Sequence, residues 1–186
     1  MTFASRAGEK LQHALTTFEI SVKDKIVADF GSSTGGFVDC LLQNGAKKVY
    51  SVDVSYGELA WNLRNDERVV VMERTNAMHV QLPEKVEVLT VDTGWTKQEK
   101  VIPNALKNIK DDGVVISLIK PHYEAPRQYL EKGKLKEEYL DEVLEKVKSD
   151  IQGLDGKILQ ITESPIEGRK GDNKEYLALI IKATRP

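Results

Sequence analysis

The stretch VADFGSSTGGFVDC, residues 27–40, decides the fold. In it, an apolar run ends in Asp29 and leads into a loop with three glycines, and an apolar helical pattern follows from Phe37 to about Gln43. A glycine-rich turn between a strand and a helix is typical of a ligand site in an α/β protein. The rest of the chain has to show which fold surrounds this turn and which ligand it suits.

Strand-like and helix-like segments alternate on both sides of this turn. Short apolar runs predict strands at residues 25–30, 47–54, 68–74, 86–92, 113–120, 157–164 and 175–183. Helical patterns occupy residues 8–20, 37–43, 58–66, a segment that ends near 109, and 134–151. Nearly continuous apolar strands indicate a sheet that helices cover on both faces. Only ten residues separate the last two strands, too few for a helical crossover, so we expect an antiparallel hairpin at one edge of a mostly parallel seven-stranded sheet.

Composition narrows the classes of protein and of partner. The chain has 186 residues and a net charge of −2, so a nucleic acid would have to be bound by local basic patches. The lone Cys40 excludes internal disulfides and a cysteine metal cluster, and the three histidines show no metal-ligand spacing. No apolar run approaches the roughly 20 residues of a membrane span, and the first ten residues lack the apolar core of a signal peptide. We therefore expect a cytoplasmic protein with no metal and no membrane partner.

The glycine loop fails the two standard phosphate-binding templates. A P-loop needs Lys after its last glycine, where this chain has Phe37, and the dinucleotide fingerprint needs glycine where it has Ser33. A helix N-terminus still suits a carboxylate or a hydroxyl-rich group, and Asp53 ends the next strand about where a ribose-binding acid sits. S-adenosylmethionine, with its adenine, ribose and amino-acid tail, fits this pattern. The alternative is that the glycines only form a tight turn and that Asp53 is a capping residue.

Charged residues fall at the ends of several predicted strands. Asp29, Asp53, Asp92 and Lys120 end strands, and Glu175 begins a strand expected to run in the opposite direction. Because ligands of open α/β sheets bind outside the carboxyl ends of the strands, these side chains are expected on one rim beside the cofactor. A lysine there can take a proton from an alcohol if burial or a second cation lowers its pKa. Taken alone, each residue is more often a helix cap or a solvated charge, and it is the joint placement on one rim that favours a site.

At these residues the chain resembles the hemolysin-A-like branch of the FtsJ-type RNA ribose 2′-O-methyltransferases. The matching stretches cover nearly the whole chain: SRAGEKLQHAL, DFGSSTGGFVDCLLQNGAKKVYSVDVSYGELAWNLRND, ERTNA, LIKPHYEA and KGDNKEYL. The resemblance implies one Rossmann-like methyltransferase domain over residues 1–186, with residues 1–22 contributing an N-terminal helix to the active site. Members of this branch usually begin with a small RNA-binding domain, and this chain starts about where that domain would end.

The resemblance also implies a cofactor, an acceptor and site residues. S-adenosylmethionine would donate a methyl group to a ribose 2′-hydroxyl of RNA, often ribosomal RNA. The Lys-Asp-Lys-Glu catalytic tetrad falls on Lys10, Asp92, Lys120 and Glu175. The cofactor residues that carry over are Asp29, Gly31, Ser33, Gly35, Gly36, Asp53 and Asn76, and we extend this set to their neighbours Ser32, Thr34, Phe37, Val54 and Ala77 and to Asp92.

Two basic segments are candidates for RNA contacts. One contains Arg127, Lys132, Lys134 and Lys136, and the other contains Arg169, Lys170 and Lys174 directly before Glu175. We expect both to contact phosphates beside the active rim, although a solvated loop explains the same charges. Trp95 and Tyr123 follow Asp92 and Lys120 and are candidates for stacking on a flipped base, with core packing as the alternative for Trp95.

Two departures keep other functions open. After Asp92 the family usually has an apolar segment, where this chain has the more polar TGWTKQEK. That departure and the missing RNA-binding domain favour a non-catalytic module that binds RNA or protein. The filled tetrad instead favours an enzyme. A partner protein that delivers RNA could then replace the missing domain. A methyltransferase acting on a small molecule is a third reading, which salt-sensitive RNA binding would contradict.

Overall fold

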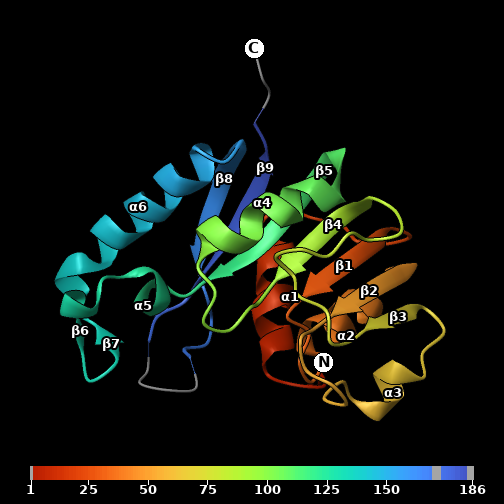
Figure 1. The fold of residues 1–186 in the computed structure, drawn as a ribbon. Coiled ribbons are helices and arrows are strands. Elements are labelled where there is room, and N and C mark those ends of the chain that lie inside the picture. The colour runs from red at the N-terminus through yellow and green to blue at the C-terminus, as the bar shows by residue number, and fades with distance from the viewer. Residues whose placement is uncertain (1, 169–172, 184–186) are drawn as a thin grey trace.

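The computed structural model describes residues 2–168 and 173–183, with a seven-stranded sheet at the centre (Figure 1). Its strands are β1 (Ile26–Phe30), β2 (Lys48–Val52), β3 (Val69–Met72), β4 (Val86–Val91), β5 (Ile109–Ile119), β8 (Gly156–Glu163) and β9 (Tyr176–Lys182). They lie in the order β3-β2-β1-β4-β5-β9-β8. The first five are parallel, and β9 runs antiparallel to both β5 and β8. The predicted α/β sheet with an antiparallel edge is confirmed.

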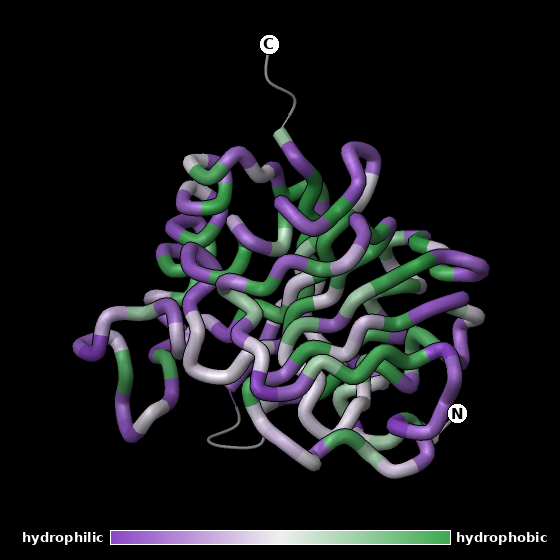
Figure 2. Tube along the Cα trace, turned by 45° about the vertical axis from the view of Figure 1, so that its right-hand side comes forward, coloured by the Kyte–Doolittle hydropathy of each residue, from purple (hydrophilic) through white to green (hydrophobic). Residues whose placement is uncertain are grey.

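Helices cover both faces of this sheet and divide the core into two clusters. The helices are α1 (Ala7–Thr17), α2 (Gly36–Gln43), α3 (Trp61–Arg64), α4 (Gln98–Asn108), α5 (Pro121–Glu124) and α6 (Leu140–Gln152), with short 3-10 turns at Arg127–Tyr129 and Glu137–Tyr139. One cluster packs Leu11 of α1 and Leu41 of α2 against the sheet, and the other packs Ile102 of α4 and Ile151 of α6. Figure 2 shows the apolar strands in the interior and polar stretches in the outer loops. Within the described ranges, no helix has the length and apolar character needed to cross a membrane.

The predicted helix over residues 134–151 is wrong at its beginning. Lys134–Leu135 form strand β7, which pairs with β6 (Leu130–Glu131) in a separate two-stranded hairpin, and α6 begins only at Leu140. The turn at Lys132 and Gly133, both with positive φ, closes the hairpin. The apolar spacing that faces the core, Val143, Val147 and Ile151, starts after this hairpin, which explains why the helix does too.

Three other boundaries differ from the prediction. The helix expected over residues 58–66 is a single turn, α3, with only Leu63 buried. The strand expected from residue 113 begins at Ile109, directly after α4. The N-terminal helix expected over residues 8–20 ends at Thr17.

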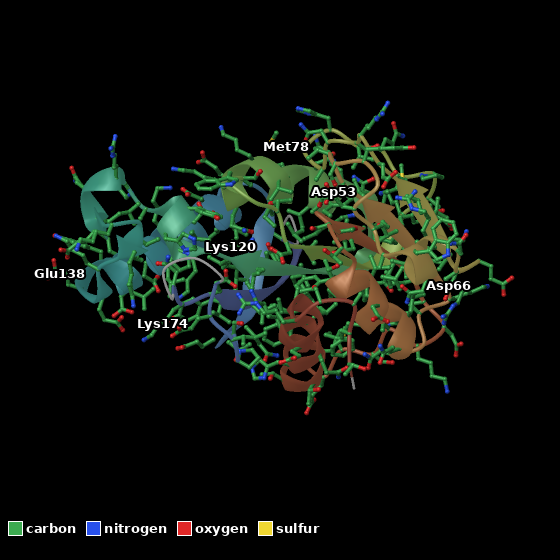
Figure 3. All side chains as sticks on the ribbon, turned by 90° about the horizontal axis from the view of Figure 1, so that it is seen from below. Asp53, Asp66, Met78, Lys120, Glu138 and Lys174 are labelled. Carbon is green, nitrogen blue, oxygen red and sulfur yellow. The ribbon has the colours of Figure 1, made fainter. Side chains whose placement is uncertain are left out.

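The order of the strands reverses between β1 and β4, which is where open α/β sheets typically bind ligands. The chain leaves β1 toward β2 on one side, while β4 pairs with β1 on the other, so the strand order reverses there. Seen from below, Figure 3 shows Asp53 and Lys120 near the middle of this end of the sheet, with Lys174 on the Lys120 side. Asp53 and Lys120, two of the strand-end charges predicted from the sequence, therefore lie at the same end of the sheet.

Candidate functional site

The glycine loop passes so close to the neighbouring strand that a side chain does not fit. Gly31 has φ +90°, and a Cβ there would lie 2.4 Å from the carbonyl oxygen of Asp92. Gly35 also has positive φ, and a Cβ on Gly36 would meet the Ser5 hydroxyl at 2.3 Å. The loop therefore needs glycine where a left-handed backbone and close approach coincide. Its backbone leads directly into the N-terminus of α2.

Asp29 is buried at the bottom of this loop with half of its carboxylate unsatisfied. Oδ1 accepts a hydrogen bond from the Thr90 hydroxyl at 2.6 Å, whereas Oδ2 has no partner among the described residues. Burial raises the pKa of Asp29 to about 7, against the opposing effect of the Thr90 hydrogen bond. A buried acceptor without a partner, in a wall of a cavity, fits a ligand that carries a hydrogen-bond donor or a positive charge.

A cavity of about 410 Å³ opens in front of the loop and collects most of the predicted site. Its lining includes all four tetrad positions, Lys10, Asp92, Lys120 and Glu175, and the predicted cofactor residues Asp29, Gly31, Ser32, Ser33, Thr34, Gly36 and Phe37. These residues come from α1, from β1 with the loop and first turn of α2 that follow it, and from the ends of β4, β5 and β9. Side chains up to 165 positions apart in the sequence thus share one cavity.

Five predicted cofactor residues do not line this cavity: Gly35, Asp53, Val54, Asn76 and Ala77. Asp53 is connected to the glycine loop, because its Oδ2 accepts the Ser33 N–H at 2.7 Å and its Oδ1 binds Ser55. Asn76 accepts the backbone N–H of Met78, and Val54 is exposed. Their role in binding a cofactor stays a prediction.

The four tetrad residues form two ion pairs. Lys120 Nζ lies 2.5 Å from Asp92 Oδ1, and Lys10 Nζ pairs with Glu175 Oε2. Lys10 and Glu175 are buried, and the Lys120 and Asp92 side chains are mostly so. In this arrangement each lysine has a carboxylate partner at the same cavity wall.

The ion pair with Asp92 keeps Lys120 protonated, which the sequence did not indicate. Burial lowers the pKa of Lys120, but the charge of Asp92 and its hydrogen bond outweigh burial, so the pKa lies above the ordinary 10.5. Glu175 acts in the same direction. The expectation that burial or a second cation lowers the pKa of this lysine is therefore wrong for the protein alone, because the Asp92 carboxylate is in direct contact with the amine.

Three aromatic rings lie beside Lys120. Trp95, whose side chain is largely exposed, stacks on Tyr123 with ring centroids 4.8 Å apart, and Tyr123 in turn contacts the ring of His122. Core packing of Trp95 is thus excluded. Burial and the nearby Lys120 lower the pKa of His122 to about 4, so its ring is neutral at pH 7, and its buried Nδ1 has no partner among the described residues.

A buried polar network holds the backbone on both sides of Lys120. Glu124 of α5 accepts the backbone N–H of Gln98 at 2.8 Å, at the first turn of α4. The Gln98 side chain accepts the Ser117 hydroxyl and donates to the Leu118 carbonyl. The network joins β5 and α5, which flank Lys120, to the helix that follows the Asp92 loop. It thereby holds both members of the Lys120–Asp92 pair on connected supports.

The predicted RNA-binding residues are only partly placed. Lys132 and Lys134 belong to the β6–β7 hairpin, with Arg127 and Lys136 on either side of it. None of these four cations forms an ion pair with another described residue, whereas Lys174 pairs with Glu137 at 2.8 Å. Arg169 and Lys170 lie outside the described residues.

Sequence reasoning missed several residues of the cavity wall: Ser5, Arg6, Ala7, Gly94, His122 and Gly168. Arg6 and Ser5 precede α1, and their approach to the glycine loop is a long-range contact without a local pattern. His122 was findable from its position two residues after Lys120. In the described part of the chain, no three His, Cys, Asp or Glu side chains cluster in a way that could hold a metal ion.

Comparisons with known proteins agree with this geometry. The family model described as FtsJ-like methyltransferase matches residues 3–181. Hemolysin A of Brachyspira hyodysenteriae is 42% identical over 96% of this chain and 77% of its own length, and the 23S rRNA (cytidine-2′-O)-methyltransferase TlyA of Campylobacter jejuni is 34% identical over 97% and 71%. A candidate hemolysin structure from Streptococcus thermophilus superimposes with a TM-score of 0.95 at 36% identity, over all of this chain and 69% of that one.

Alignments with two other curated relatives cover a smaller share of the relative, 65% and 47% of its length. Matches at lower identity share the Rossmann-like methyltransferase fold, with TM-scores of 0.66 and 0.70 at 17% identity. A family model that covers nearly the whole chain and relatives that align over almost all of it lead to the same assignment. The chain belongs to the FtsJ-like methyltransferase family.

Proposed function

We propose that this protein transfers a methyl group from S-adenosylmethionine to a ribose 2′-hydroxyl of ribosomal RNA. One observation carries the proposal: the Lys120–Asp92 and Lys10–Glu175 pairs face the same cavity as the glycine loop. A cofactor site and a set of proton-transfer groups thus border one space. The name of the Campylobacter relative supports the choice of ribosomal RNA and the 2′-oxygen.

The residues present fit the cofactor. Asp29 Oδ2 offers a buried acceptor for an ammonium group. Gly31 and Gly36 let the Asp92 carbonyl and the Ser5 hydroxyl pack directly against the loop, which shapes the cavity in front of it. When bound, S-adenosylmethionine supplies a methyl group on a positively charged sulfur. We assign the amino-acid tail to the cavity and the adenosine to the neighbouring edge with Asp53, Val54, Asn76 and Ala77.

The four tetrad residues receive distinct roles. Lys120 would accept the proton that the 2′-hydroxyl loses as its oxygen takes the methyl group, with the sulfur–methyl bond breaking and a neutral thioether, S-adenosylhomocysteine, leaving; Asp92 would orient the amine. Lys10, held by Glu175, is the second cation of the cavity and opposes protonation of Lys120. Because Asp92 raises the pKa of Lys120, the lysine must lose a proton before it can act as a base.

We further propose that RNA lies across the β6–β7 hairpin and the aromatic rings. Arg127, Lys132, Lys134 and Lys136 are cations without described carboxylate partners, which suits phosphate contacts. Lys174, which pairs with Glu137, would add to this surface. Arg169 and Lys170, outside the described residues, stay candidates from the sequence alone. The exposed ring of Trp95, already stacked on Tyr123, would receive a flipped base.

In this function residues 1–186 act as one catalytic domain, and α1 contributes Lys10 to its active site. It implies a cytoplasmic location, where ribosomal RNA is assembled into subunits. If the chain alone does not bind its substrate, a partner protein would deliver the RNA.

The experiment is methyl transfer from labelled S-adenosylmethionine to ribosomal subunits. We expect label in RNA with the wild type and about 100-fold or greater loss in Lys120→Ala. The matched control is Lys110→Ala, because Lys110 lies on the same strand and also pairs with a carboxylate, Glu87, but outside the cavity. Alkaline hydrolysis then locates the methyl group, since a 2′-O-methyl blocks cleavage of the adjacent phosphodiester.

The other outcomes separate the alternatives. Cofactor binding without label, even when a delivery partner is added, would favour a non-catalytic module that binds RNA or protein. Absence of cofactor binding would mean that the glycine loop is only a turn. Label in a small molecule with no salt-sensitive RNA binding would indicate a different acceptor.

A further inference from the structure

The β6–β7 hairpin is too small to hold its own position. Each strand has two residues, and the register pairs Leu130 with Leu135 and Glu131 with Lys134. An isolated two-stranded hairpin is marginally stable in water. The hairpin contains Lys132 and Lys134, so its position decides where these charges lie relative to the cavity.

One buried side chain attaches this hairpin to the catalytic edge. Asn173 is 3% exposed, its Oδ1 accepts the Leu135 N–H at 3.1 Å, and its Nδ2 donates to the Gly133 carbonyl at 3.2 Å. The amide thus binds the backbone on both sides of Lys134. Asparagine is suited to this contact because its amide offers one acceptor and two donors, whereas aspartate offers only acceptors and alanine neither.

Asn173 is also close in the chain to the catalytic groups. It lies two residues before Glu175, which pairs with Lys10, and three before Tyr176, which stands opposite Ile119 in the sheet. Lys120 follows Ile119. The connection from the hairpin to the tetrad therefore runs through a short segment fixed at both ends.

We propose that Asn173 is a positioning residue that fixes the basic β6–β7 hairpin relative to Glu175 and Lys120. This inference rests on the proposed function. RNA phosphates bound by Lys132 and Lys134 would then be held at a set distance from the cavity, and that distance selects which ribose reaches Lys120. Asn173 therefore acts on RNA binding and on the register of the RNA, and not on cofactor binding.

The test compares Asn173→Ala with the wild type for KM toward ribosomal subunits, kcat, cofactor affinity and the salt dependence of RNA binding. We expect KM to rise by about fivefold or more, because two hydrogen bonds to the hairpin are removed, while cofactor affinity stays within about twofold. The slope of log affinity against log salt should fall by about one unit for each phosphate that the displaced lysines no longer neutralise. Asn44→Ala is the matched control, because its amide also clamps a backbone carbonyl and a side chain, but between α1 and α2.

A double-mutant cycle distinguishes positioning from a general structural role. In a Lys132→Ala, Lys134→Ala background, Asn173→Ala should add less than about a twofold effect on KM, because the charges that it positions are gone. Should Asn173→Ala lose its cooperative melt, Asn173→Asp is used in the same cycle, since it keeps the acceptor for Leu135. An equal effect of the mutation with and without the lysines, or no effect in either background, overturns the inference. Absence of methylation by the wild type would instead refute the proposed function.

Discussion

Protonation of Asp29 should control the affinity of the protein for its cofactor. The carboxylate is buried in the cavity wall, its Oδ2 has no described partner, and burial raises its pKa to about 7. The proposed ammonium of S-adenosylmethionine interacts favourably with the carboxylate but not with the neutral acid. Binding should therefore weaken as the pH falls below 7.

The size of the effect follows from the pKa. At pH 5, two units below about 7, only ~1% of Asp29 is ionised, so the apparent affinity should fall about 100-fold, or ~2.7 kcal/mol, relative to the fully ionised state. Two other titratable groups of the cavity wall do not mimic this titration. His122, with its pKa lowered to about 4, stays neutral, and Lys120, with its pKa raised, stays charged.

The assay is isothermal titration of S-adenosylmethionine into the protein between pH 5 and 7.5, with Asp29→Asn as the comparison. The variant keeps an acceptor for the Thr90 hydroxyl and cannot titrate. It should bind weakly at pH 7.5 and show little change to pH 5. A wild-type affinity that does not change over this range, or an equal change in Asp29→Asn, would refute the reasoning.

Three further outcomes follow from the same structure. Gly31→Ala should lower the free energy of unfolding in urea by roughly 1–3 kcal/mol, because its Cβ would meet the Asp92 carbonyl at positive φ; an unchanged midpoint would contradict this. Burial raises the pKa of Glu124 above 4.5 in the folded state, so the protonated carboxyl stabilises the fold below that pH and this stability is lost as the pH rises and the group ionises. Glu124→Gln stays neutral and should therefore become more stable relative to the wild type as the pH rises from 4.5 to 8, as measured by urea unfolding. Trp95→Ala should leave thermal stability nearly unchanged but raise KM for RNA about 10-fold if its ring stacks on a base beside Tyr123, and equal kinetics would exclude the stacking role.

The sheet and much of its rim could be predicted because the governing physics is local. Strands buried on both faces are apolar over most of their length, so their carboxyl ends are visible where a charge follows, as at Asp92 and Lys120. Asp29 lies inside β1, one residue before its end. The place of Glu175 follows from length, since ten residues cannot make a helical crossover. The confirmed antiparallel direction of β9 brings it to the cavity.

The parts that were missed depend on contacts between side chains and distant backbone. Residues 134–139 carry the charges of a helix surface, but Leu135 donates its N–H to Asn173, 38 positions away, and forms a hairpin instead. Arg6 reaches the cavity through packing that leaves no periodic trace. Such pairings have no sequence spacing from which to infer them.

The resting charges of the tetrad restrict how it can act. Two lysines and two carboxylates face one cavity as ion pairs, so their formal charges cancel, and the Lys120 amine is held protonated by Asp92. Asp92 therefore has two opposed effects: it orients Lys120 but makes the lysine a poorer proton acceptor at neutral pH. Burial of Lys120 opposes that effect, and a second positive charge in the cavity adds to the opposition; among the tetrad residues Lys10 is the one that carries such a charge. Glu175, which pairs with Lys10, itself raises the pKa of Lys120, so both carboxylates of the tetrad oppose the loss of its proton.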